Sequence, residues 1–188
     1  PLPSIKSFDE SGWVVYLGSF SKVIAPGLRV GYAVVDNDEL LKKMVIGKQA
    51  TDVHSPLLNQ AIVDGYLRSG RMPDHLARIC ADYKARLQVM LDGLGKLPPS
   101  ISYTRPEGGL FVWAQLPEGA DALEMLKKAI EKNVAFVPGT HFYFDCGHLS
   151  TLRLNFSSGK TEDVAEGMAR LTPVILETLE SIKTEGSK

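Results

Sequence analysis

The 188-residue chain contains only two cysteines, Cys80 and Cys146, and no apolar run near the ~20 residues that span a bilayer. Two cysteines are too few for a disulfide framework and indicate a reducing compartment, so we expect a cytoplasmic protein. Lysine and arginine (21) balance aspartate and glutamate (22), which leaves no basic face for nucleic acid. The N-terminal residues lack the basic region and apolar core of a signal peptide. We therefore expect neither a membrane span nor nucleic-acid binding through this chain.

Two apolar segments near the N-terminus, residues 12–18 and 28–35, are continuous rather than alternating. This pattern is typical of strands buried on both faces of a parallel-type sheet. Trp13 is accordingly expected to be a core anchor. Residues 1–35 offer almost no neighbouring strands or helices for such burial, so we expect this segment to be the edge of a larger sheet outside the chain. In such a fragment the two strands would expose apolar edges and associate or stay disordered.

The rest of the chain has the pattern of a self-contained small α/β unit. Asparagine and aspartate at 36–38 predict a cap for a helix to about residue 49, and Ser55-Pro56 predicts another helix to residue 68. Apolar residues spaced by three and four predict a long helix over 72–95. Asp121 and Glu124 form a capping-box pattern for a helix to residue 133. Short strands are predicted near residues 101–103, 110–116, 134–137 and 152–156, before a final helix over 161–183.

The segment that carries chemistry follows the first apolar run. Ser19, Ser21 and Lys22 lie within four residues, and Arg29 follows after a turn at residues 26–27. Hydroxyl donors and a guanidinium are suited to a phosphate, which arginine binds through paired charge-assisted hydrogen bonds. A lysine beside that site, partly desolvated and near a second cation, would have a lowered pKa and could attack a carbonyl. The combination suits a phosphorylated aldehyde cofactor, whereas each residue taken alone also fits a solvated loop charge (Lys22, Arg29) or a serine that caps a turn.

The pattern Ser-x-Ser-Lys followed by Pro-Gly-Leu-Arg-x-Gly in residues 19–31 resembles the cofactor-lysine motif of class I and II aminotransferases. These are fold-type-I enzymes that use pyridoxal 5′-phosphate (PLP). Residues 104–113, 137–143 and 152–157 are similar to segments of the small domain of the same family. Within the family, the sequence of these segments is most similar to the α-aminoadipate and aromatic aminotransferase branch. The resemblance covers roughly residues 12–182.

The resemblance implies a role for each matching residue. Lys22 would form the Schiff base with PLP and then move the α-proton of the substrate as general base and acid. Ser19, Ser21 and Arg29 would hold the cofactor phosphate, and Arg153 would bind the substrate α-carboxylate. The implied reaction transfers an amino group from an L-amino acid (2-aminoadipate-like, aromatic or branched-chain) to a 2-oxoacid such as 2-oxoglutarate. The intact protein is expected to be a homodimer.

The resemblance also implies that this chain is only the C-terminal part of a fold-type-I transferase. Residues 1–36 would end the large PLP-binding domain, and residues 37–188 would form the connecting helices and the small domain. The phosphate-binding helix start, the aromatic residue that stacks on the ring and the acid at the pyridine nitrogen lie upstream in these enzymes. We therefore expect the chain alone to be inactive.

Other functions fit the same residues. The chain could be the aminotransferase-like effector domain of a helix-turn-helix transcriptional regulator, and a β-lyase on the same fold is a third candidate. His141, Asp145, Cys146 and His148 lie close in sequence, but their spacing fits no standard zinc pattern, so no metal is expected.

Overall fold

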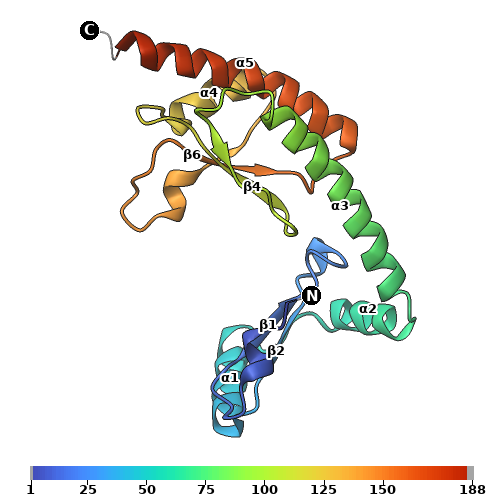
Figure 1. The fold of residues 1–188 in the computed structure, drawn as a ribbon. Helices are drawn as coiled ribbons and strands as arrows, with labels where there is room; N and C mark the ends of the chain where they lie inside the picture. Colours follow the sequence, from blue (N-terminus) through green and yellow to red (C-terminus); the bar gives the residue numbers. More distant parts are fainter. Residues whose placement is uncertain (1, 186–188) are drawn as a thin grey trace. The chain divides into compact units, whose positions relative to one another are not determined.

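The structure is a computed structural model that describes residues 2–185. The chain divides after Ala77 into two compact units, here called the N-terminal unit and the C-terminal unit (Figure 1). This division is defined by contacts between residues of the chain. The domain boundary expected after residue 36 is instead that between the large and small domains implied by the resemblance, and it stays a prediction. None of the helices within residues 2–185 combines the length and the apolar character needed to cross a membrane.

The N-terminal unit is built on a two-stranded hairpin, in which β1 (Tyr16–Ser19) pairs antiparallel with β2 (Gly31–Val34). Gly18 lies opposite Tyr32, and a Cβ atom on Gly18 would overlap the Tyr32 ring, so this position requires glycine. The 3-10 turns η1 (Ile5–Phe8) and η2 (Pro26–Leu28) flank β1. The unit continues with the helices α1 (Asp38–Thr51) and α2 (Leu57–Arg68) and the start of α3 (Met72–Leu94).

The two apolar segments do not form buried parallel strands, so that expectation is wrong for this chain, whereas the expected exposure of their apolar side chains is confirmed. Their association or disorder stays a prediction. The strands are antiparallel to each other, every residue of β2 is exposed, and Trp13 is 85% exposed rather than a core anchor. Among the hydrophobic residues described in this unit, Val30 and Val63 are the buried ones. The continuous apolar pattern requires cover on two faces, and the described residues do not supply it.

The predicted helices of the N-terminal unit are confirmed with small shifts. The Asn37 side chain caps α1 by accepting a hydrogen bond from the Leu40 N–H at 2.9 Å. For α2, Pro56 rather than Ser55 occupies the cap position, and its side chain makes no capping hydrogen bond. Pro56 has a ψ of 126°, so helical geometry begins one residue later than predicted.

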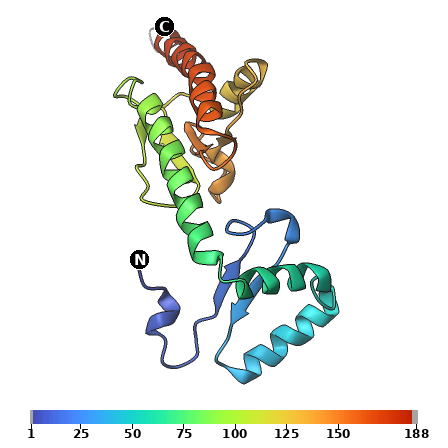
Figure 2. The ribbon, with the colours of Figure 1, turned by 90° about the vertical axis from the view of Figure 1, so that its right-hand side faces the viewer.

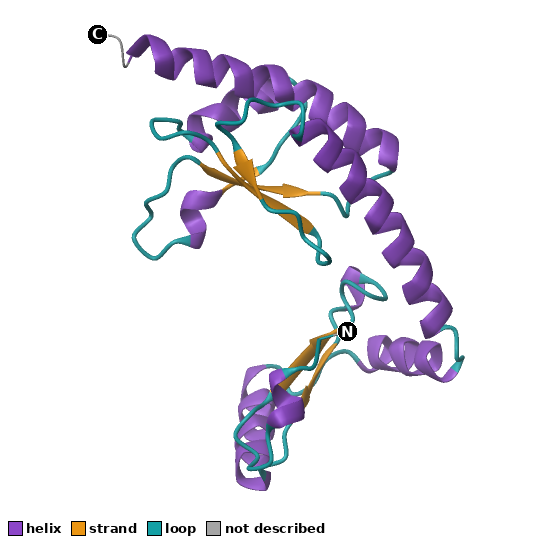
Figure 3. Ribbon diagram, viewed as in Figure 1, coloured by secondary structure: helices purple, strands orange, loops and turns teal. Residues whose placement is uncertain are grey.

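The C-terminal unit is a four-stranded antiparallel sheet covered by helices (Figure 3). The strand order is β3-β4-β6-β5, with bounds Ser102–Tyr103, Phe111–Gln115, Thr151–Asn155 and Val137–Pro138. The helical elements are the remainder of α3, α4 (Ala122–Glu131), η3 (Gly139–Phe142) and α5 (Thr161–Glu185). Alternation along β4 and β6 buries one set of side chains under the helices and turns the other set, which includes Arg153, to the opposite face.

The core of the whole chain lies almost entirely in the C-terminal unit. Figures 1 and 2 show α3 and α5 side by side, and Gly93 of α3 lets Met168 of α5 approach closely. The capping role predicted for Asp121 is confirmed, because its carboxylate accepts from the backbone N–H groups of Leu123 and Glu124. The predicted strand at 134–137 is shorter than expected and begins at Val137. The largest fully buried side chains are Leu94, Val112, Leu116, Met125, Leu152, Phe156, Leu171 and Ile175, with Thr151 among them.

Candidate functional site

The loop between β1 and β2 holds the predicted phosphate and lysine residues. The Phe20 carbonyl accepts hydrogen bonds from the N–H groups of Val23, Ile24 and Ala25 at 3.3, 2.8 and 3.2 Å. The Phe20 N–H in turn donates to the Val30 carbonyl at 3.1 Å. The first turn of the loop is therefore closed by hydrogen bonds to the Phe20 carbonyl, and the Phe20 N–H links the start of the loop to its end.

This winding places three of the predicted residues together. Arg29 Nη1 donates to Ser21 Oγ at 3.3 Å and to the Pro26 carbonyl at 3.3 Å. The Ser21 N–H donates to Ser19 Oγ at 3.2 Å. The guanidinium and two hydroxyls thus form one exposed cluster at the end of β1, and its donors match the oxygens of a phosphate.

Lys22 lies in the same loop, next to Ser21, and its side chain is exposed. The partial desolvation expected for this lysine is therefore not observed in the structure. Arg29 has a left-handed backbone conformation, with φ of 54° and ψ of 40°. A non-glycine residue adopts this conformation only when the surrounding contacts hold it there.

An aromatic cluster adjoins the loop on the hairpin. The rings of Phe20 and Tyr32 lie 5.3 Å apart, and those of Tyr16 and Tyr32 lie 6.1 Å apart. Desolvation of the Tyr32 hydroxyl, followed by its hydrogen bond with Tyr16, raises the pKa of Tyr32 above its usual value. Tyr32 therefore stays protonated and neutral beside the loop at physiological pH.

Arg153 lies in the C-terminal unit, on β6 directly opposite Trp113 of β4. Its guanidinium carbon is 4.0 Å from the centre of the Phe111 ring and 4.7 Å from that of Phe142. The Nε atom is buried and has no hydrogen-bond partner among residues 2–185. A buried guanidinium N–H without a partner is uncommon in folded proteins, and an anion is a suitable acceptor for it. The two aromatic rings lie against the guanidinium group.

Neither phenylalanine was predicted from the sequence. Phe111 could have been found, because it lies two positions from the residue opposite Arg153 and so shares its face of the sheet. Phe142 comes from η3, and it meets Trp113 edge-on at 5.6 Å. No sequence spacing indicates that contact.

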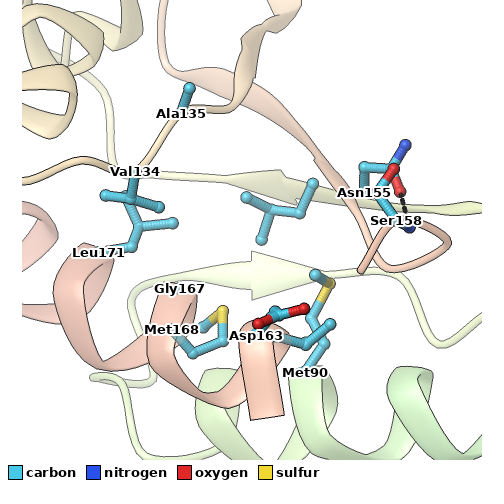
Figure 4. A pocket seen from close by; sticks show the side chains of 11 residues that line it. Met90, Val134, Ala135, Asn155, Ser158, Asp163, Gly167, Met168 and Leu171 are labelled. Carbon is cyan, nitrogen blue, oxygen red and sulfur yellow. Dashed lines mark hydrogen bonds between the residues drawn. The ribbon is translucent and has the colours of Figure 1, made fainter. Parts of the chain in front are cut away.

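A separate hollow of about 130 Å³ lies in the C-terminal unit, between the end of β6, α3 and α5 (Figure 4). Its polar groups are used locally: Asn155 accepts from the Ser158 N–H at 3.2 Å, and Asp163 accepts from the Lys160 N–H at 2.7 Å. None of the predicted site residues lines it. Most of the other lining side chains are apolar, namely those of Met90, Val134, Ala135, Leu154, Val164, Met168 and Leu171.

The family model described as aminotransferase class I and II matches residues 3–171. A 2-aminoadipate transaminase of Thermus thermophilus is 46% identical over 174 residues, which cover 90% of this chain. An aromatic-amino-acid aminotransferase of Thermococcus litoralis is 41% identical over 95% of the chain. Each match spans 43% of the relative's own length, so the chain spans less than half of these proteins.

A solved structure gives the same result for the fold. The α-aminoadipate aminotransferase of Thermus thermophilus, solved with N-(5′-phosphopyridoxyl)-L-leucine, is 43% identical and superposes with a TM-score of 0.84. The match covers 88% of this chain and 42% of that protein. The mixed α/β fold is therefore that of part of a fold-type-I transferase, as expected from the sequence.

Proposed function

The chain belongs to the class I and II aminotransferase family, and from this premise we propose that it is the lysine-bearing C-terminal portion of a PLP-dependent aminotransferase. The observation that carries the proposal is the hydrogen bond from Arg29 to Ser21, directly before Lys22. It joins an anion-binding cluster to a primary amine within one loop. The solved relative with a phosphopyridoxyl ligand supports the same cofactor.

The residues of this loop fit the phosphate of PLP. Ser19 and Ser21 offer hydroxyl donors, and Arg29 offers a guanidinium whose charge matches a phosphate dianion. We propose that these three residues hold the phosphate and that Lys22 carries the cofactor aldehyde. When bound, PLP supplies an electron sink that stabilises negative charge at the α-carbon of an amino acid.

Two residues of this chain have separate roles toward the substrate. Lys22 Nζ is the base that removes the proton from the substrate α-carbon and the acid that returns a proton. Its exposure leaves the amine free to reach a ligand. We propose that Arg153 binds the α-carboxylate, because its Nε is buried without a partner and its guanidinium is held between Phe111 and Phe142. A carboxylate accepts two parallel hydrogen bonds from arginine, and this fixes the substrate's orientation.

The substrates proposed are an L-amino acid of the 2-aminoadipate, aromatic or branched-chain type and a 2-oxoacid such as 2-oxoglutarate. The names of the two relatives, a 2-aminoadipate and an aromatic-amino-acid enzyme, support the first two of these types. We further propose a cytoplasmic homodimer for the intact protein. The two free cysteines, Cys80 and Cys146, are consistent with a reducing compartment.

The proposal is tested by borohydride reduction in the presence of PLP, followed by peptide mapping, on the 188-residue chain and on the full-length gene product. Selective labelling of Lys22 in the full-length protein is the expected result, and Lys22→Ala should remove it. Labelling spread over many lysines, in both proteins, would refute the proposal.

The same full-length protein separates the enzyme from the regulator. An aminotransferase should convert an amino acid and 2-oxoglutarate with turnover. An effector domain of a transcriptional regulator should show Lys22 labelling, no turnover and a DNA-binding domain in its sequence. We expect the 188-residue chain alone to be inactive, and turnover by it at an enzymatic rate would contradict that expectation.

A further inference from the structure

Two side chains from outside the lysine loop hold its backbone. The Asn59 Nδ2 group on α2 donates to the Leu28 carbonyl at 2.9 Å. The His75 Nε2 atom on α3 lies 2.9 Å from the Val23 carbonyl. Leu28 directly precedes Arg29, and Val23 directly follows Lys22. The first contact therefore fixes the peptide group that adjoins Arg29, and the second fixes the peptide group one residue beyond Lys22.

The chemistry of these contacts is well defined. A carbonyl oxygen can only accept, so Nε2 of His75 must carry the proton. The His75 and Tyr66 rings form a T-shaped pair, with centroids 5.8 Å apart and an interplanar angle of 84°. Both side chains are partly buried, whereas Gln60, the neighbour of Asn59, is exposed and its side-chain Nε2 donates to the Ser55 carbonyl.

The loop needs such support near Arg29. Arg29 is held in the left-handed conformation, which an L-residue leaves unless its neighbours restrain it. The internal hydrogen bonds of the loop converge on Phe20 at its start, and the Leu28 N–H bond to the Ala25 carbonyl is long, at 3.4 Å. The backbone of Leu28 is therefore held by a long hydrogen bond from within the loop and by the Asn59 amide from outside it.

We propose that Asn59 and His75 are positioning residues that hold the loop so that Arg29, Ser21 and Lys22 face one bound cofactor. They act on the loop's backbone and touch neither the phosphate nor the substrate. The inference rests on the proposed function for the identity of the ligand. Its structural part, the bracing of the loop, stands on the two contacts alone.

The test measures hydrogen exchange of the peptide spanning residues 20–30 and PLP affinity at Lys22 in the 188-residue chain and the full-length protein. The variants are Asn59→Asp, which is isosteric but loses the donor, and His75→Ala, with Gln60→Ala as the matched control. Loss of one net hydrogen bond predicts exchange faster by about three- to tenfold and PLP affinity weaker by a similar factor. His75→Gln, whose amide can reach the same carbonyl, should recover part of both. The thermal midpoint, measured alongside, should stay near that of Gln60→Ala.

The outcomes separate the two proposals. Exchange that is the same in Asn59→Asp, His75→Ala and the control overturns the bracing. Faster exchange with unchanged PLP affinity overturns the positioning role. Faster exchange in a protein that never labels at Lys22 supports the bracing and refutes the proposed function.

Discussion

Replacing Gly139 with alanine probes how tightly η3 packs against the sheet face that carries Arg153. A Cβ atom at this position would overlap Thr151 Oγ1 and lie 2.7 Å from Thr151 Cβ and 2.8 Å from Trp113 Cη2. Ordinary contact begins at 3.4 Å, so the new atom is about 0.7 Å too close to the Thr151 Cβ. Thr151 is 1% exposed, so it has no open space into which to move.

The cost follows from these contacts. Rotating the Thr151 side chain would relieve the overlap with Oγ1, but it would break the bond from that hydroxyl to the His148 carbonyl at 2.7 Å. Losing a buried hydrogen bond costs about 1–3 kcal/mol. The remaining overlap with the Thr151 Cβ must be relieved by moving η3 away from β6, and overpacking of this kind costs about 1–3 kcal/mol. We therefore expect Gly139→Ala to lower the free energy of unfolding by about 2–6 kcal/mol, out of the 5–15 kcal/mol typical of a domain.

The assay is urea unfolding followed by tryptophan fluorescence in a Trp13→Phe background, so that Trp113 alone reports on the C-terminal unit. The matched control is Gly167→Ala, inside α5, where the nearest atom to a new Cβ is Val134 Cγ2 at 3.9 Å. This variant should stabilise the unit by about 0.5–1 kcal/mol, because alanine favours the helix over glycine. Equal unfolding midpoints for Gly139→Ala and the parent would refute the reasoning.

Two further predictions follow from single contacts. The backbone N–H of Val14, followed by the Lys6 ammonium, holds the pKa of the Asp9 carboxylate well below its usual range. Its stabilising contribution is present above the unfolded pKa of about 3.9 and is lost as the pH falls through the lower folded pKa. Asp9→Asn should therefore make the free energy of unfolding fall less steeply with decreasing pH below about pH 4. An equal pH dependence of this free energy in variant and parent would contradict the prediction. In the full-length protein, Phe142→Ala removes one of the two rings against Arg153 and should raise the KM for the amino acid about three- to tenfold, in line with a cation–π contact. Phe144, which is fully exposed, is its control, and an equal rise in Phe144→Ala would show that the ring does not act through Arg153.

The elements that the sequence predicted correctly are those whose signals are local. The helix α3 follows from apolar spacing alone, and the start of α4 follows from Asp121, whose carboxylate binds the first free N–H groups. The pairing of β1 and β2 was predicted wrongly from their apolar segments. A continuous apolar run indicates that a strand should be buried, but it does not indicate which strand pairs with it. In this structure β1 and β2 are partners of each other, through the loop that joins them.

The same distinction explains the site. Ser19, Ser21 and Arg29 lie within one short loop, so their sequence pattern was enough to bring them together. Asn59 and His75 contact that loop from 31 and 52 residues away, and such a contact depends on how the helices pack on the hairpin. A histidine and an asparagine on two helices carry no spacing that marks a shared target, so sequence reasoning could not find them.

Both units expose large apolar side chains within residues 2–185, and the C-terminal unit also holds a buried polar atom without a partner. In the C-terminal unit the Nε of Arg153 is buried without an acceptor, on the face of β6 opposite the core residues Leu152 and Leu154. A cost of this kind, about 1–3 kcal/mol, persists in a stable fold when the group serves a ligand. In the N-terminal unit the unmade contacts are apolar: Trp13 and Leu17 are 85% and 71% exposed. Exposed apolar surface is satisfied by protein surface rather than by a small anion. The exposed apolar side chains of the hairpin before Lys22 are therefore suited to cover by protein surface, whereas the buried Nε of Arg153 is suited to an anionic acceptor.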